Sequence, residues 1–207
     1  MILDASITDS PRKPRGKKQY EAVEDRHEDT GEIATKAVEK IQRHIDPEAA
    51  WIKKGNRLRF GFKQHTGTDD NGLAVGVVTT PANESDIVHL DDVLDKIPLK
   101  PRATVKADKG YKSTNNDSAI KKRGLRNCVL HKVTKNKSLT PREIQFNKLV
   151  SKTRYKVERT FGSMRRWFGA GTARYVGLAK MHTQHLMEAI AYNLYRAPGI
   201  VVSNCES

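Results

Sequence analysis

Residues 103–111 of this chain read ATVKADKGY. The first five residues predict a short strand, and Asp108 follows at its carboxyl end, where Gly110 permits a sharp turn. Ligands of open α/β sheets bind beyond the carboxyl ends of strands, so a carboxylate placed here is a candidate for function. A single aspartate after a strand is more often a turn or capping residue. Asp108 therefore needs partners elsewhere in the chain.

Strand and helix patterns alternate on both sides of this stretch. Before it, we predict the end of a strand at 1–6, a hairpin from 58–63 and 73–80, and a helix over 85–95. After it, we predict a helix at 118–123, a strand at 127–133, a long helix over 141–162, and an amphipathic helix over 182–196 that Pro198 stops. This order predicts an α/β fold, with a mixed sheet flanked by helices.

One segment interrupts that alternation, an insert at about 9–56 that is predicted to be basic and helical. Residues 9–19 carry five cations between Pro and Gly residues, which is typical of an exposed loop. Over 31–45 the apolar residues recur at helical spacing, so we predict a short amphipathic helix there. Residues 134–141 are predicted to be a second basic loop.

Composition indicates the kind of partner. The 207 residues include 38 Lys and Arg against 24 Asp and Glu, a formal charge of +14, which favours a polyanion such as nucleic acid. Cys128 and Cys205 are far apart, so neither a zinc site nor a disulfide framework is expected. We find no signal peptide and no apolar run long enough to span a bilayer. The sequence predicts one cytoplasmic domain with no membrane partner.

Three carboxylates stand in contexts that suggest a common site. Asp4 is predicted to end the first strand, Asp108 ends a later one, and Glu158 lies in the long basic helix. If the two strands are neighbours, all three acids converge, and Mg²⁺ prefers such oxygen ligands for in-line phosphoryl transfer. The alternative for Glu158 is an ion pair with a neighbouring arginine such as Arg154 or Arg165.

Six motifs carry a resemblance to a known family: ILDASITD (2–9), DPEAAWIKKG (46–55), GFKQHTGTD (61–69), TTPANESD (79–86), ADKGY (107–111) and RYKVERTFG (154–162). Together they resemble the DDE domain of bacterial insertion-sequence transposases, most closely insertion-sequence family five within the family-four clan. The resemblance runs over residues 1–197 and leaves 198–207 as a C-terminal tail predicted to be disordered. It implies a ribonuclease-H-like, retroviral-integrase-like fold in which Asp4, Asp108 and Glu158 are catalytic and hold two Mg²⁺ or Mn²⁺ ions.

The family signature around the third acid is Tyr-x2-Arg-x3-Glu-x6-Lys. Arg154 and Glu158 match it, whereas Ser151 stands at the Tyr position and Arg165 at the Lys position. The resemblance implies phosphate contacts for Arg154 and Arg165. The further residues expected to bind DNA are Arg166, Lys109, Lys63 and His65, the last two from the Gly-x-Lys-x-His motif, where His65 could equally be structural.

Two alternatives remain open at the ends of the long helix. Glu143 follows Asp108 by 35 positions, the spacing seen in retroviral integrases, but an acid at a helix start is explained by the helix dipole, so Glu158 is favoured. Trp167 and Phe168 could stack on a displaced base, although core packing is the better interpretation.

The expected function is that of a transposase catalytic domain, which performs metal-dependent DNA strand cleavage and strand transfer. Expected partners are the terminal inverted repeats of the element, target DNA and a second copy of the chain, in the nucleoid. Full-length relatives carry a region before the first catalytic strand, and this chain starts three residues before Asp4. The alternatives are a truncated, inactive DNA-binding remnant and, less favoured, another nuclease of the same fold.

Overall fold

The computed structural model describes residues 1–14, 20–26, 33–39, 44–134 and 138–205. Its centre, within these residues, is a six-stranded mixed sheet in the order β4-β5-β1-β7-β8, with β6 also paired to β5. The strands are β1 (Ile2–Asp9), β4 (Ala50–Lys54), β5 (Arg57–Thr68), β6 (Ala74–Pro81), β7 (Thr104–Ala107) and β8 (Arg126–Val129). β5 runs antiparallel to β1, β4 and β6, whereas β1, β7 and β8 are parallel. The α/β prediction is confirmed, and the arrangement agrees with a ribonuclease-H-like fold.

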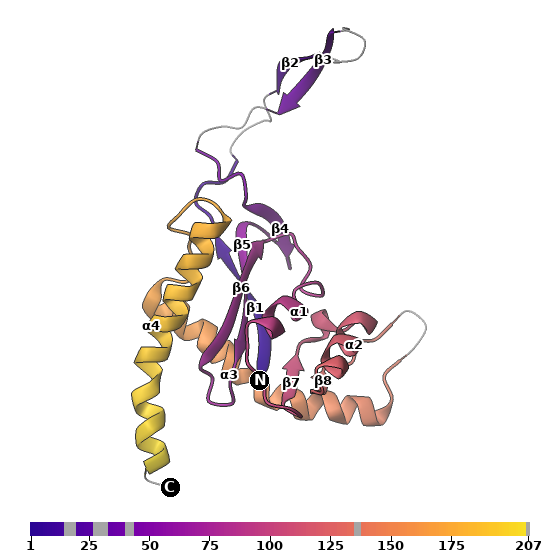
Figure 1. Cartoon of the computed structure of the whole chain (residues 1–207), viewed down its shortest axis with the longest axis vertical. Helices are drawn as coiled ribbons and strands as arrows, with labels where there is room; N and C mark the ends of the chain where they lie inside the picture. Colours follow the sequence, from indigo (N-terminus) through magenta and orange to yellow (C-terminus); the bar gives the residue numbers. More distant parts are fainter. Residues whose placement is uncertain (15–19, 27–32, 40–43, 135–137, 206–207) are drawn as a thin grey trace.

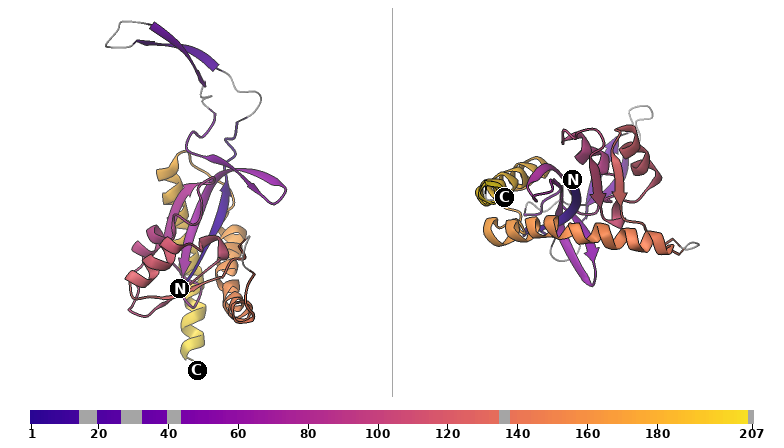
Figure 2. Two further views of the ribbon diagram at one scale, coloured as in Figure 1. Left: turned by 90° about the vertical axis from the view of Figure 1, so that its right-hand side faces the viewer. Right: turned by 90° about the horizontal axis from the view of Figure 1, so that it is seen from below.

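Helices cover both faces of this sheet (Figures 1 and 2). They are α1 (Leu90–Asp95), the short 3₁₀ turn η1 (Lys109–Tyr111), α2 (Thr114–Lys122), α3 (Pro141–Phe168) and α4 (Leu178–Cys205). α1 and α2 enclose one hydrophobic core, which contains Leu3, and α3 and α4 enclose a second, which contains Ile2. Successive β1 residues thus point to opposite faces, as the pleat requires. Asp4, two residues after Ile2, therefore faces α3.

The insert is a hairpin rather than a helix. β2 (Tyr20–Arg26) and β3 (Ile33–Glu39) pair antiparallel and project from the body of the molecule (Figure 1). The helix predicted over 31–45 is therefore wrong for residues 33–39, while 31–32 and 40–43 lie outside the described residues. The β-branched residues Ile33, Thr35 and Val38 suit a strand, and pairing with β2 supplies the backbone hydrogen bonds.

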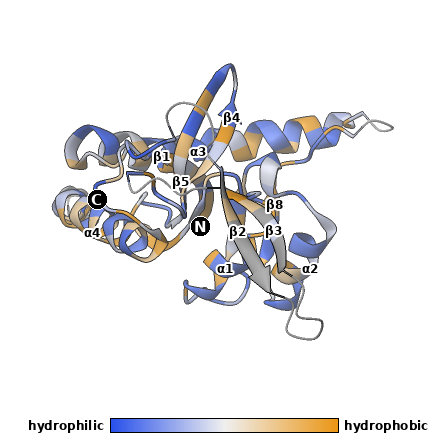
Figure 3. Cartoon of the chain, turned by 90° about the horizontal axis from the view of Figure 1, so that it is seen from above, coloured by the Kyte–Doolittle hydropathy of each residue, from blue (hydrophilic) through white to orange (hydrophobic). Residues whose placement is uncertain are grey.

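Several predicted boundaries also differ. β1 continues to Asp9, so Asp4 lies inside the strand and not at its end. α1 begins only at Leu90, and β8 ends at Val129, before the predicted limit. α3 passes Gly162 and ends at Phe168; it is capped by Gly169, whose φ of 70° lies in the left-handed region that favours glycine. Bands of hydrophilic and hydrophobic residues alternate along this helix in Figure 3.

The last helix does not stop at Pro198. α4 continues to Cys205, so at least residues 198–205 are helical instead of a disordered tail. Proline removes the hydrogen bond to the carbonyl of Leu194, four residues earlier. Leu194 is 71% exposed, so water can satisfy that carbonyl. In the described part of the chain, no helix combines the length and apolarity needed to cross a membrane.

Candidate active site

The pairing of β1 with β7 sets two of the three predicted acids side by side. The parallel register places Ile2 opposite Lys106 and Leu3 opposite Ala107, so Asp4 and Asp108 are the next residues along each chain. Asp108 caps η1, because its Oδ1 accepts a hydrogen bond from the Lys109 amide at 2.7 Å. Oδ1 of Asp4 accepts one from the Ala5 amide at 2.9 Å. Local backbone contacts thus fix both carboxylates.

Arg154, on the face of α3 that packs over β1, joins these acids. Its Nη2 donates to Oδ2 of Asp4 at 3.0 Å, and its Nη1 donates to Oδ1 of Asp108 at 3.2 Å. Nη2 also lies 4.0 Å from Oε1 of Glu158, one helical turn further on. α3 is held against the sheet by buried residues on the same helix, including Val157 and Phe161. One guanidinium therefore contacts all three predicted acids.

Glu158 is the loosest member of the group. Its side chain is 63% exposed, against 20% for Asp4 and 35% for Asp108. Among the residues that the structure describes, no group of three or more His, Cys, Asp and Glu side chains is arranged to hold a metal ion. The acids converge on Arg154 rather than on one another.

Burial and charge act against each other at this cluster. Burial raises the pKa of Asp4, while Arg154 opposes that rise. Burial also disfavours the charged form of Arg154, but Asp4 and Asp108 outweigh it, so the pKa of Arg154 lies above its ordinary value. Arg154 consequently stays a full positive charge at the centre of the acids.

Comparison with known proteins identifies the family of the chain. The profile of the family described as "Transposase DDE domain" matches residues 2–194. The chain belongs to the transposase DDE domain family. It is 36% identical over 196 residues to the transposase for insertion sequence element IS1106 of Neisseria meningitidis serogroup B. That alignment covers 95% of this chain and 64% of the relative, so the chain spans less than two thirds of the relative's length.

Three of the cations expected to bind DNA lie on the surface of this DDE domain. Arg165 lies about three helical turns after Arg154 on α3. It donates to Oγ of Ser6 at 2.5 Å and so links α3 to β1. Burial, followed by the nearby charge of Arg59, lowers the pKa of Arg165. The guanidinium of Arg166 stands 4.9 Å from the ring centre of Trp167, and Lys109 is exposed beside Asp108. These side chains are accessible to a polyanion.

Lys63 and His65 are not accessible in this conformation, contrary to the prediction that they bind DNA. The Lys63 side chain is 8% exposed and pairs with Asp86 at 2.9 Å. His65 is fully buried, with Nδ1 3.1 Å from the Tyr111 hydroxyl, and burial lowers its pKa to about 4. The reason is that β5 is buried continuously from Phe60 to Thr68, so its polar residues are internal as well.

Tyr111 is a supporting residue that the sequence reasoning missed. It is the last residue of η1, the turn that directly follows Asp108, and it is 1% exposed. Its contact with His65 connects the Asp108 turn to the central strand β5. The signal available in the sequence was the aromatic residue in ADKGY together with the histidine in the Gly-x-Lys-x-His motif.

The alternative third acid, Glu143, has a different structural role. It forms a capping box with Thr140, whose hydroxyl accepts from the Glu143 amide at 3.3 Å while the Glu143 carboxylate accepts from the Thr140 amide at 2.8 Å. It also lies 3.7 Å from His131. Eleven residues of helix put it about 16 Å along the axis from Arg154. Ser151, at the signature Tyr position, is exposed.

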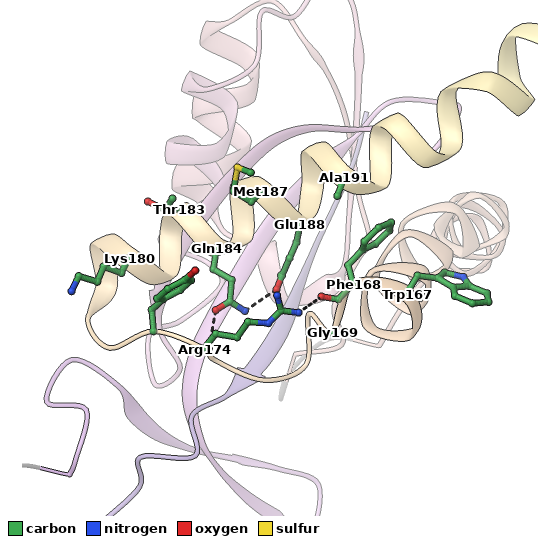
Figure 4. A pocket seen from close by; sticks show the side chains of 11 residues that line it. Trp167, Phe168, Gly169, Arg174, Lys180, Thr183, Gln184, Met187, Glu188 and Ala191 are labelled. Carbon is green, nitrogen blue, oxygen red and sulfur yellow. Dashed lines mark hydrogen bonds between the residues drawn. The ribbon is translucent and has the colours of Figure 1, made fainter.

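A separate cavity of about 790 Å³ lies between the end of α3 and the start of α4 (Figure 4). Aromatic and apolar side chains, among them Trp167 and Phe168, line it together with Arg174 and Glu188. Trp167 is 57% exposed, so the prediction that it packs in the core is wrong, whereas Phe168 does pack against a core cluster. None of the three predicted catalytic acids reaches this cavity.

Proposed function

We propose that this chain is the catalytic domain of an insertion-sequence transposase, which cleaves and transfers DNA strands in a reaction that depends on divalent metal. One observation carries the proposal: the β1–β7 register sets Asp4 beside Asp108, and α3 brings Arg154 and Glu158 to the same point. Membership of the DDE family supports the same reaction class. Asp4, Asp108 and Glu158 are proposed as the catalytic acids.

The carboxylate oxygens of these three acids are of the type that divalent metal ions prefer as ligands. DDE transposases generally use divalent metal ions, and Mg²⁺ and Mn²⁺ favour carboxylate oxygens. Within the described residues, Oδ2 of Asp108 accepts no hydrogen bond, and Glu158 is bound only through its long contact with Arg154. These acids would hold two ions, which supply an activated water and stabilise the leaving oxygen when bound.

The cations around the acids hold the DNA backbone. Arg154 and Arg165 can each offer two parallel N–H donors to a phosphate, which fixes its position as well as its charge. Arg166 and Lys109 extend the basic surface on either side. Lys63 and His65 support the site from inside the sheet, since both are buried. A chain of formal charge +14 adds a general attraction for DNA.

The proposed partners follow from the same reaction. They are the terminal inverted repeats of the element and target DNA, with a second copy of the chain in the DNA complex. The proposed location is the bacterial nucleoid within the cytoplasm. The second candidate is a DNA-binding remnant without catalysis, and one observation favours it: Arg154 forms salt bridges with Asp4 and Asp108.

A strand-transfer assay tests the proposal. The chain is incubated with terminal-repeat DNA and Mg²⁺ or Mn²⁺, beside its Asp108→Asn variant, which keeps the size of the side chain but removes its charge. We expect nicking and joining by the parent only. Equal, negligible turnover with retained DNA binding would instead favour the remnant.

A further inference from the structure

The position of Arg154 is more specific than a phosphate contact requires. An ordinary bridge between neighbouring helical turns would join Arg154 to Glu158. Instead, guanidinium nitrogens of Arg154 lie 3.0 Å from a carboxylate oxygen of Asp4 and 3.2 Å from one of Asp108. The nearest carboxylate oxygen of Glu158 is further away, at 4.0 Å. The guanidinium thus prefers the two acids on the sheet, which come from positions 150 and 46 residues away in the sequence. It is the cation that lets these carboxylates lie close together.

A positive charge in this place competes with any other cation that needs the same oxygens. Asp4 and Asp108, which accept from Arg154 through Oδ2 and Oδ1 respectively, are two of the acids that the proposed function assigns to divalent metal. Two cations close to the same carboxylates repel each other strongly where the site is partly shielded from water. Metal binding therefore favours departure of Arg154 from the acids.

Few polar contacts hold Arg154 in this position. Nε of Arg154 is buried and makes no hydrogen bond within the described residues, so only the acids hold the guanidinium. The Arg154 side chain is 17% exposed and the adjacent Glu158 side chain is 63% exposed, so the cluster meets solvent on the side of Glu158. A DNA phosphate offers two oxygens in the geometry that a guanidinium prefers.

We propose that Arg154 is an exchangeable counter-ion: it neutralises Asp4 and Asp108 until a DNA phosphate takes its guanidinium, and its transfer frees both carboxylates for divalent metal. The inference rests on the proposed function and adds a regulation of the same site. Because linkage is reciprocal, DNA binding and metal binding favour each other through this side chain. Without DNA, Arg154 keeps metal affinity low and so restrains cleavage.

The first test measures Mn²⁺ affinity by titration calorimetry on the chelator-treated chain without DNA. Arg154→Gln should bind Mn²⁺ at least about tenfold more tightly than the parent, because a competing charge in contact with the ligands is gone. Lys109→Gln is the matched control: it removes one charge next to Asp108 that, within the described residues, forms no ion pair with the acids, and its affinity should rise by less than about threefold. Equal affinity in Arg154→Gln and the parent, or an equal rise in both variants, overturns the proposal.

The second test measures the coupling itself. DNA affinity is compared by fluorescence anisotropy with and without Ca²⁺ at constant ionic strength, so that ions bind without turnover. In the parent, Ca²⁺ should tighten DNA binding by about tenfold. In Arg154→Gln the ratio should fall toward one, whereas Lys109→Gln should keep the parent ratio. An unchanged ratio in Arg154→Gln contradicts the exchange.

Two further variants keep the outcomes distinct. If Asp108→Asn binds Mn²⁺ as the parent does, the proposed metal site itself is wrong. If Asp108→Asn loses Mn²⁺ binding while Arg154→Gln leaves it unchanged, the site stands and only the exchange fails. Should Arg154→Gln not fold, Arg154→Met removes the charge and keeps a long, unbranched side chain. Its Mn²⁺ affinity should exceed that of the parent, and equality counts against the proposal.

Discussion

The histidine that anchors α4 to the sheet should make the protein sensitive to acid. Nε2 of His185 lies 3.0 Å from the Thr8 hydroxyl, and Nδ1 lies 2.8 Å from the Thr79 hydroxyl. Thr8 donates its own proton to the Ala170 carbonyl, so it accepts from Nε2–H. Nδ1 then accepts from Thr79, which the neutral ring allows. Burial lowers the pKa of His185 from 6.5 to about 3.

The sign and size of the effect follow from that pKa. A depressed histidine pKa means that the unfolded state binds the proton first, so the stability from neutral His185 is complete above pH 6.5 and is lost as the pH falls toward 3. Between pH 7 and pH 5 the loss from this one group is about 2 kcal/mol. That is a large part of the 5–15 kcal/mol typical of a domain.

Urea unfolding followed by circular dichroism at pH 7, 6 and 5 measures this slope. His185→Gln should be less stable than the parent at pH 7, but its free energy of unfolding should fall by about 2 kcal/mol less on going to pH 5. Asp4 and Glu188, whose pKa values burial raises, are common to both proteins and cancel in the comparison. If parent and variant lose stability in parallel, His185 is not the buried neutral group described above.

Three other substitutions test separate parts of the structure. Tyr111→Phe should lower the free energy of unfolding by about 1–3 kcal/mol in urea titrations, because it leaves Nδ1 of His65 buried without its partner. Thr140→Ala should cost about 1 kcal/mol by the same measurement, because it removes the cap of α3; a loss within error would mean that the capping box is not formed in solution. Arg165→Ala should weaken DNA binding evenly across sequences and reduce the salt slope of the binding constant by about one unit, with Mn²⁺ affinity retained.

The sequence predicted the elements that place the acids, for physical reasons. β7 and α3 carry strong local signals, and the apolar residues around Asp4 and Asp108 indicate buried strands. That β1 and β7 are neighbours is a property of the sheet pairing, which the sequence left as a condition. The position of Arg154 was only half predicted. Its spacing put it beside Glu158, but the length of its side chain allowed contacts with acids on two strands that no pattern along one helix reveals.

The errors also have physical causes. Over residues 33–39, the spacing of the apolar residues fits a helix as well as it fits a strand. Pairing with β2 selects the strand. At Lys63 and His65, polar side chains suggested a surface, whereas β5 is the central strand and buries both. The alternation that predicts an exposed face fails for a strand covered on both sides.

The central claim, that Asp4, Asp108 and Glu158 form a divalent-metal site, is tested most directly by thermal unfolding with and without Mn²⁺. An ion that binds only the folded chain, at about one hundred times its dissociation constant, should raise the midpoint by about 5–10 °C. The rise should disappear in Asp108→Asn and shrink in Glu158→Gln. A midpoint that Mn²⁺ does not move, or one that rises equally in the parent and both variants, would contradict the account.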